Sequence, residues 1–128
     1  MCRDTYFHYT DKEGLRGILR TMVILKSPSG RHGPGVYLTT IGPDNGWDNV
    51  TTNNWGGTFA GNEGKADYAI SMKLPREKVT RCDSSRVDIY LFGEDVVLQR
   101  VNFRLHSKNS DHEAVRKEAE INYRCTLL

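Results

Sequence analysis

The sequence predicts an α+β fold formed by a single domain over residues 1–128, with one helix near each end of the chain and strands between them. An apolar stripe at helical spacing follows a short aromatic segment near the N-terminus. Alternating apolar segments occupy the second half, and a strongly charged helical segment ends the chain. With 128 residues, of which 38% are apolar and 27% charged, the chain has the size and composition of one globular domain.

A strand and a helix are predicted at the N-terminus. Thr5-Tyr6-Phe7-His8-Tyr9 is rich in aromatic and β-branched residues, as strands are. Thr10-x-x-Glu13 has the pattern of a capping box and predicts the start of a helix. The apolar residues that follow recur at helical spacing: Leu15, Ile18, Leu19 and Met22. A short extended piece and a loop then lead to a second strand over residues 35–39.

The second half supplies the remaining strands. Residues 41–64 are rich in Gly, Asn, Asp and Thr and form a loop longer than most connections, which is typical of functional loops. Alternation predicts further strands, at residues 66–74, 79–82, 86–92 and 96–106. The turn Gly93-Glu94-Asp95 predicts that the last two of these strands form a hairpin. A charged helix is predicted from Ser110 to about residue 121.

The charge of the chain disfavours bulk binding of nucleic acid. Eighteen Lys and Arg against sixteen Asp and Glu leave a net charge of +2, with both signs interleaved and no polybasic stripe along the chain. No long apolar run is present, so we expect neither secretion nor a transmembrane segment, and the scattered cysteines favour an intracellular and most simply cytoplasmic location. We also expect a monomer. The final Cys125-Thr126-Leu127-Leu128 has the form of a prenylation box, for which chance is the simpler explanation.

The cysteines and histidines show no metal-binding pattern. Neither a Cys-x-x-Cys pair nor the spacing of a zinc site occurs among the residues inspected, which are Cys2, Cys82, Cys125, His32, His106 and His112. We therefore expect neither a disulfide framework nor a bound metal.

Three polar residues are candidates for chemistry. His8, between two aromatic residues, and Tyr37 are each, taken alone, more typical of a protein core. Asp88 is more unusual, because a carboxylate in an alternating apolar segment is costly unless it is paired or used. A buried arginine partner would explain Asp88 without a catalytic role. The arginines considered for this pairing are Arg81, Arg86 and Arg100.

Taken together with their flanking residues, these three positions resemble a known family. Phe7-His8-Tyr9-Thr10 and Gly14-Leu15-x-Gly17-Ile18-Leu19, followed by Gly33-Pro34-Gly35-Val36-Tyr37-Leu38-Thr39, resemble the ADP-ribosyltransferase-like domains that carry a His-Tyr-Asp signature. The likeness continues more loosely through Asp67-Tyr68-Ala69-Ile70 and Leu74-Pro75 to Asp88-Ile89-Tyr90-Leu91. These domains are similar to poly-ADP-ribose polymerases and diphtheria-type toxins. The resemblance implies a split β-sheet with an N-terminal and a C-terminal helix around an NAD cleft.

The resemblance also implies a role for each residue of the signature. His8 and Thr10 would hydrogen-bond the adenosine ribose of NAD, and Tyr37 would stack on the nicotinamide. Asp88 would favour the oxocarbenium-like transition state. The other positions implied in NAD binding are Tyr9, Gly33, Gly35 and Thr39. Arg31, in the loop before the tyrosine, is suited to the pyrophosphate, although a solvated loop charge explains it equally well.

Two positions depart from the family pattern, and one partner stays open. The acid is Asp88 where related transferases often carry Glu, and Arg86 replaces the Gln or Glu of arginine-modifying members. Modification of arginine is therefore disfavoured. A second aromatic residue often covers the nicotinamide, and the eligible residues here are Trp47, Trp55, Phe59 and Tyr68.

The resemblance implies an NAD-dependent ADP-ribosyltransferase. Such an enzyme cleaves the nicotinamide–ribose bond and transfers ADP-ribose to a macromolecular acceptor, a protein or a nucleic acid, with residues 41–64 shaping the choice. One alternative is a non-catalytic module that binds NAD, ADP-ribose or a protein partner. Another is an RNA 2'-phosphotransferase-like enzyme, for which too few basic residues are suitably placed. Trp47 and Trp55 fit stacking on a nucleobase and packing of the loop equally well.

Overall fold

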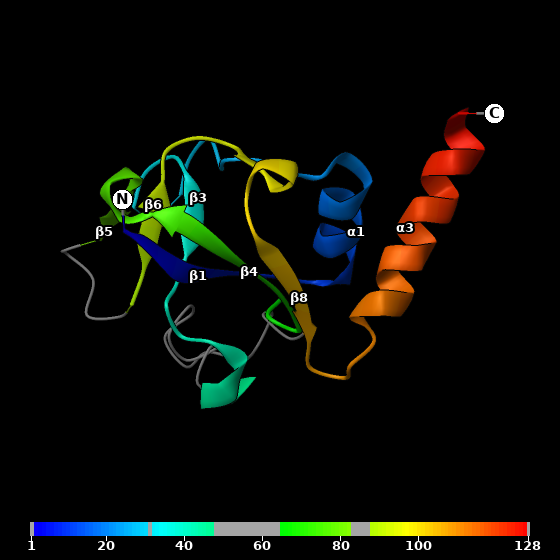
Figure 1. Ribbon diagram of the computed structural model, residues 1–128, viewed down its shortest axis with the longest axis horizontal. Helices are drawn as coiled ribbons and strands as arrows, with labels where there is room; N and C mark the ends of the chain where they lie inside the picture. Colours follow the sequence, from blue (N-terminus) through cyan, green and yellow to red (C-terminus); the bar gives the residue numbers. More distant parts are fainter. Residues whose placement is uncertain (1, 31, 48–64, 83–87, 128) are drawn as a thin grey trace.

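The computed structural model describes residues 2–30, 32–47, 65–82 and 88–127, with side chains described as far as residue 120, and has an α+β architecture (Figure 1). This agrees with the predicted fold class. The helices and strands, in chain order, are β1 (Arg3–Thr10), α1 (Lys12–Thr21), β2 (Val23–Ile24), β3 (Val36–Leu38), β4 (Tyr68–Pro75), β5 (Val79–Arg81), β6 (Tyr90–Phe92), β7 (Val96–Val97), β8 (Phe103–Ser107) and α3 (His112–Leu127). Short 3-10 turns occur at Pro43–Asn45, Arg76–Lys78 and Leu98–Arg100.

The strands of the described residues form antiparallel sheets. One sheet has the order β1-β4-β8, a second has the order β3-β6-β5, and β2 pairs with β7. The two larger sheets meet where Phe7 of β1 pairs with Thr39, directly after β3, through N–O distances of 2.8 and 3.0 Å. This junction places the residues around His8 beside those around Tyr37.

The core lies between the sheets and the helices. Nearly every residue of β4 is buried, since this strand has a neighbour on each side and its even-numbered residues face the core. On one face of the β1-β4-β8 sheet α1 packs its buried Leu15 and Leu19, and α3 lies against α1 with Val115 and Ala119 (Figure 1). The sheet therefore has a covered inner face and an outer face, the latter carrying the odd-numbered residues of β1 and β4.

The start of α1 differs from the capping box predicted at Thr10. Asp11 is the N-cap, and its side chain accepts a hydrogen bond of 2.7 Å from the backbone N–H of Gly14. Thr10 still belongs to β1, where it pairs with Tyr68, so the helix begins one residue later than the pattern predicts. Met22, with a left-handed φ of 61°, ends the helix.

The predicted hairpin between residues 86–92 and 96–106 is wrong. β6 is shorter than predicted and pairs with β3 and β5, whereas β7 pairs with β2. The 3-10 turn at Leu98–Arg100 interrupts the predicted long strand and delivers β8 to the edge of the β1-β4-β8 sheet. Alternation indicates which face of a strand is buried but not which strand lies beside it, and that is why the hairpin prediction failed.

The C-terminal helix is confirmed and is longer than predicted, ending at Leu127 rather than near residue 121. Cys125 of the predicted prenylation box lies in this helix, but its side chain is outside the described part. Residues 48–64, the larger part of the predicted functional loop, are also outside it, as are residues 83–87 at the start of the predicted strand 86–92.

Candidate functional site

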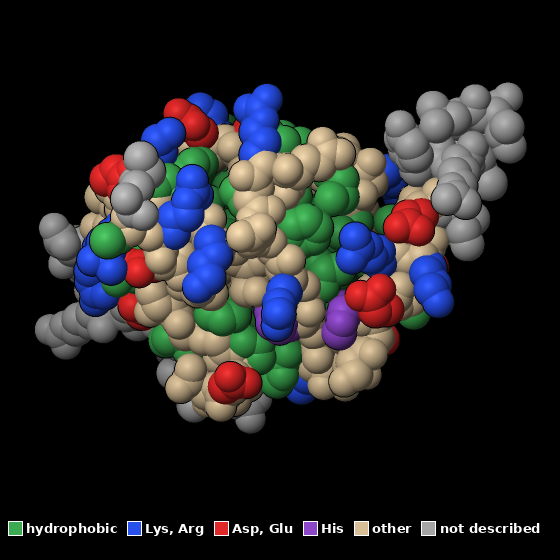
Figure 2. Space-filling model, in the orientation of Figure 1, with side chains coloured by type: hydrophobic (Ala, Val, Ile, Leu, Met, Phe, Trp, Pro, Cys, Tyr) green, Lys and Arg blue, Asp and Glu red, His purple; other side chains and the backbone are tan. Residues whose placement is uncertain are grey.

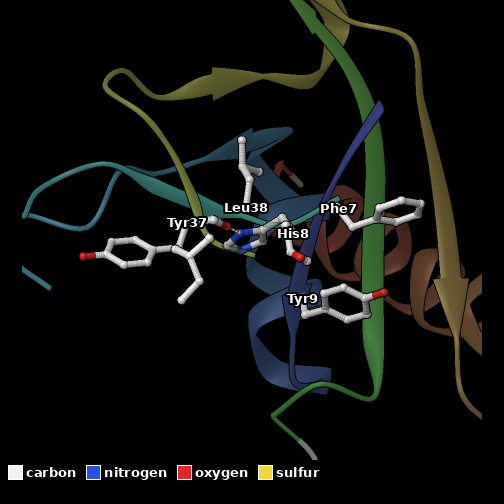
Figure 3. Close-up of a pocket in the computed structure, with 7 residues that line it drawn as sticks. Phe7, His8, Tyr9, Tyr37 and Leu38 are labelled. Carbon is white, nitrogen blue, oxygen red and sulfur yellow. Dashed lines mark hydrogen bonds between the residues drawn. The ribbon is translucent and has the colours of Figure 1, made fainter. Parts of the chain in front are cut away.

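A pocket of about 220 Å³ opens where β1 meets β3 (Figure 3). The residues that line it come from β1, from β3 and its end, and from the segment that leads into β6: Phe7, His8, Tyr9, Tyr37, Leu38, Thr39 and Ile89. His8 and Tyr37, which are 29 positions apart in the chain, thus line one pocket. The bridge between Phe7 and Thr39 holds the two walls together.

The imidazole of His8 is fixed by a backbone hydrogen bond. Successive side chains of β1 alternate, so His8 points between β1 and β3 while Phe7 and Tyr9 point to the other side (Figure 3). Its Nδ1 lies 2.9 Å from the carbonyl oxygen of Tyr37. Because a carbonyl only accepts, Nδ1 carries the proton and donates.

Burial then determines the charge of His8. It lowers the pKa of the imidazole, and the hydrogen bond to the carbonyl of Tyr37 opposes this shift only in part. His8 is therefore neutral near pH 7, with Nδ1 protonated and Nε2 unprotonated. In this tautomer Nε2 is a hydrogen-bond acceptor, which suits a hydroxyl group of a ligand.

Tyr37 is held by the loop that precedes its strand. Its hydroxyl donates to the carbonyl of Gly33 and accepts from the backbone N–H of His32, both at 2.8 Å. Gly30 leaves room for the phenol, because a Cβ at that position would lie 2.4 Å from the tyrosine oxygen. The ring points away from the imidazole of His8, although both line the pocket (Figure 3). The phenol is thus an aromatic surface with a fixed orientation.

Asp88 lies beside the pocket rather than in its wall. One carboxylate oxygen accepts hydrogen bonds from the hydroxyl of Thr39 at 2.7 Å, and from the backbone N–H and hydroxyl of Thr40 at 2.5 and 2.7 Å. The other oxygen lies 3.4 Å from the guanidinium of Arg81. Its neighbours in space and sequence, Thr39 and Ile89, both line the pocket.

These contacts keep Asp88 ionised. Burial alone raises the pKa of the carboxyl group, but the hydrogen bonds from Thr39 and Thr40 and the charge of Arg81 outweigh it, and the pKa lies below its usual value. Of the three arginines considered as buried partners, Arg81 lies beside Asp88 but is itself exposed, and Arg86 is outside the described residues. Thr40 was not predicted from the sequence, and no local pattern indicates it, because it meets Asp88 only through the fold.

The structure brings together some of the predicted binding residues and separates others. His8, Tyr9, Tyr37 and Thr39 line the pocket, whereas Thr10 does not. Thr10 ends β1, and its hydroxyl lies where a Cβ on Gly14 would be. The predicted contact of Thr10 with the adenosine ribose therefore has no counterpart in this pocket. Arg31 lies outside the described residues.

The two glycines predicted to bind NAD have supporting positions instead. Gly33, at φ 101°, accepts the hydrogen bond of the Tyr37 hydroxyl. Gly35, at φ 148°, backs onto β6, where a Cβ would lie 3.0 Å from the carbonyl oxygen of Phe92. Neither lines the pocket, and both shape the segment that carries Tyr37, where the resemblance implies that they clear space beside the tyrosine.

Two of the four aromatic residues eligible to cover the nicotinamide, Tyr68 and Trp47, lie among the described residues. Tyr68 is buried and donates its hydroxyl to Asp111 at 2.7 Å, so it belongs to the core. Trp47 packs edge-on against Tyr9, with ring centroids 5.8 Å apart, and thus adjoins the pocket. Tyr9 is itself anchored by a hydrogen bond of 2.8 Å to the carbonyl of Ile41. Trp55 and Phe59 are outside the described residues.

Phe7, Leu38 and Ile89 line the pocket without having been predicted to do so. Their positions next to His8, Tyr37 and Asp88 are the only signal in the sequence that could have indicated them.

In the described part of the chain, no group of three or more His, Cys, Asp or Glu is arranged to hold a metal ion. Nor does any described helix have the length and apolar character needed to cross a membrane. Comparison of the chain with family models, curated proteins and solved structures found no match. The case for a function is therefore carried by the residues of the pocket and their geometry.

Proposed function

We propose that this chain is an NAD-dependent ADP-ribosyltransferase. The observation that carries the proposal is the arrangement at the junction of β1 and β3. A neutral imidazole with an acceptor nitrogen and a fixed phenol line one pocket, and an ionised carboxylate adjoins its wall. These three groups are those of the His-Tyr-Asp signature that the sequence resembles.

The pocket suits one half of the dinucleotide. Its volume of about 220 Å³ is below the range of roughly 300–1,000 Å³ typical of complete ligand sites, so the rest of NAD would extend over the open side. Nε2 of His8 would accept a hydrogen bond from a ribose hydroxyl. Tyr37, with its hydroxyl already engaged, would offer its ring to the flat nicotinamide.

The reaction needs a negative charge near the anomeric carbon. The bond from ribose C1' to the nicotinamide nitrogen breaks, and neutral nicotinamide leaves with the bonding electron pair. A nucleophilic nitrogen or oxygen of the acceptor then bonds to C1' and loses its proton to solvent. The oxocarbenium-like transition state is cationic, and the carboxylate of Asp88, ionised because its pKa is lowered, would stabilise it.

Release of nicotinamide from NAD tests the proposal. We expect the wild-type chain to release it, and His8→Ala and Asp88→Asn to do so at least 100-fold more slowly, which is the usual scale for losing an electrostatic contact in a transition state. Glu94→Gln, an exposed acid next to β6, is the matched control and should leave the rate unchanged. Equal, slow release by the wild type and Asp88→Asn with every acceptor class offered would overturn the proposal.

A second candidate function follows from the contacts of Asp88. One of its oxygens already accepts three hydrogen bonds and the other faces Arg81, as in a carboxylate that stabilises the fold. This favours a module that binds NAD or ADP-ribose without cleaving it. Calorimetry separates the two, because the module binds NAD with no release of nicotinamide, and Asp88→Asn then leaves the affinity unchanged when measured on folded protein.

A further inference from the structure

The outer face of the β1-β4-β8 sheet carries a groove lined by positive charges. Two adjoining hollows, of about 570 and 220 Å³, share Lys73 and Asn102 in their walls. The positively charged residues in their walls are Arg3, Lys73, Arg100 and Arg104. We call the two hollows together the cationic groove. Figure 2, in the orientation of Figure 1, shows Lys and Arg side chains gathered over these strands. Among the described residues, no acidic side chain lines either hollow.

The register of the sheet assembles this groove from remote parts of the chain. Lys73 of β4 lies opposite Thr5 of β1, and Arg104 of β8 lies opposite Ser71 of β4. Arg3 lies two residues before Thr5, so its side chain is on the same face. Arg100 comes from the 3-10 turn that leads into β8. The four cations therefore line two adjoining hollows although they are spread over the sequence from position 3 to position 104.

The charges of the groove are not neutralised by the described part of the chain. All four cationic residues are exposed, and none forms an ion pair with a described carboxylate. The carboxylate of Asp4 is bound to Arg76 at 2.7 and 3.0 Å, and this hydrogen bonding is the main reason that the pKa of Asp4 is lowered. The charge of Lys73 adds to that shift, but Asp4 forms no ion pair with Lys73. The groove thus keeps a surplus of positive charge for a polyanion.

The polar residues between the cations fit a phosphate backbone. Thr5 and Asn102 add a hydroxyl and an amide group to the walls, and such groups accompany Arg and Lys in contacts with phosphate and sugar. A hollow along a sheet face suits one flexible strand, because single-stranded nucleic acids are held in positively charged grooves that follow their backbone.

The cationic groove adjoins the pocket along β1, with Thr5 two positions from Phe7 and with His8 on the opposite side of the strand. Thr5, Phe7 and Tyr9 follow one another along the outer side of β1, the first lining the groove and the other two lining the pocket. Phe7 also pairs with Ser71, which lines the groove. We infer that the cationic groove binds single-stranded nucleic acid and presents it to the pocket as the acceptor of ADP-ribose. This inference rests on the proposed function for its second half, while the binding itself does not depend on NAD.

Fluorescence anisotropy with labelled 20-nucleotide single strands of DNA and RNA measures the binding. The test variant is Lys73→Gln/Arg104→Gln, and the matched control is Lys12→Gln/Lys117→Gln, which removes the same charge from exposed positions on α1 and α3. Losing two phosphate contacts should lower the slope of log affinity against log salt by about 1.4, which corresponds to about 25-fold weaker binding at 0.1 M salt if affinities converge at 1 M. The control should bind like the wild type.

Three results would overturn the inference: no binding of either strand by the wild type, equal losses in both double variants, or tighter binding of polyglutamate, which would indicate an acidic protein partner. Nicotinamide release without acceptor reports the proposed function separately. If Lys73→Gln/Arg104→Gln keeps that release and loses only binding of the strand and its labelling by ADP-ribose, the groove is the acceptor site. If wild-type release is absent but the strand is bound, the proposed function fails while the groove stands.

Discussion

Replacement of Asp88 by asparagine isolates the charge that the fold has arranged around this residue. The side chain is 20% exposed and keeps its shape in the variant, so packing is retained. What changes is the acceptor of the hydrogen bonds from Thr39 and Thr40, and the partner of Arg81. A carboxylate becomes a neutral amide, whose oxygen can still accept from the same donors.

The magnitude follows from the number of hydrogen bonds. A bond to a charged group contributes roughly 1.5–3 kcal/mol, against roughly 0.5–1.5 kcal/mol for a neutral pair. Three such bonds therefore lose about 3 kcal/mol in total, and the smaller cost of burying an amide offsets part of this loss. We expect a net decrease of about 1–2 kcal/mol in the free energy of unfolding at pH 7. For a domain of this size that lowers the Tm by about 4–7 °C.

The effect should depend on pH in a defined direction. The pKa of Asp88 is lowered in the folded state, so its contribution is fully present above the unfolded value of about 3.9 and is lost as pH falls through the folded pKa. Urea unfolding of wild type and Asp88→Asn between pH 3 and 7 measures this. The difference in stability should be constant above about pH 5 and shrink below pH 4.

Asp4→Asn is the matched control, because Asp4 also has a lowered pKa but pairs with Arg76 at the surface. Exposed ion pairs contribute little, so this variant should lose much less stability than Asp88→Asn. Wild-type stability of Asp88→Asn at pH 7, or a deficit that is the same at pH 3, would contradict a stabilising role for the charge of Asp88.

Four further variants, one of them a control, test the geometry of the site. Burial lowers the pKa of His8, so its contribution is full above about pH 6.5 and falls as pH drops below that; His8→Gln should flatten this slope in urea unfolding, and an unchanged slope would contradict the assignment. Gly30→Ala should displace the phenol of Tyr37 and weaken NAD binding about 10-fold by calorimetry, whereas Gly17→Ala, whose Cβ meets nothing, should bind NAD normally and gain about 0.5–1 kcal/mol in stability. Gly35→Ala, forced to φ 148° against β6, should lose about 1–3 kcal/mol by urea unfolding, and wild-type stability there would refute the close approach.

Local patterns were enough to predict the fold class and several elements. The first strand and the helix after it follow from aromatic content and from the spacing of Leu15 and Leu19, and the structure has β1 and α1 there. These features are local, because a periodic run of side chains determines which face is buried whatever it packs against. The same logic failed for the hairpin after residue 86, since strand pairing involves partners that the run itself does not specify.

The same distinction between local and tertiary information applies to the residues of the candidate site. From the motifs around them the sequence singled out His8, Tyr37 and Asp88, and it raised the possibility that an arginine neutralises the acid. It could not indicate that Thr39 and Thr40 hold that carboxylate, nor which nitrogen of His8 bears the proton. The first depends on the hydroxyls of Thr39 and Thr40 and a backbone N–H, and the second on the carbonyl of Tyr37, all of which β3 and its end bring near.

Periodicity and composition act over a few neighbouring positions, so the sequence indicates the kind of each element and the residue types available for chemistry. Which charges lie close together depends on the fold. Along the chain the Lys and Arg residues alternate with acids and form no stripe, yet the register of β1, β4 and β8 places Lys73 and Arg104 on one outer face. Electrostatic fields add according to distance in space, so a surface of one sign can arise from a sequence of mixed sign.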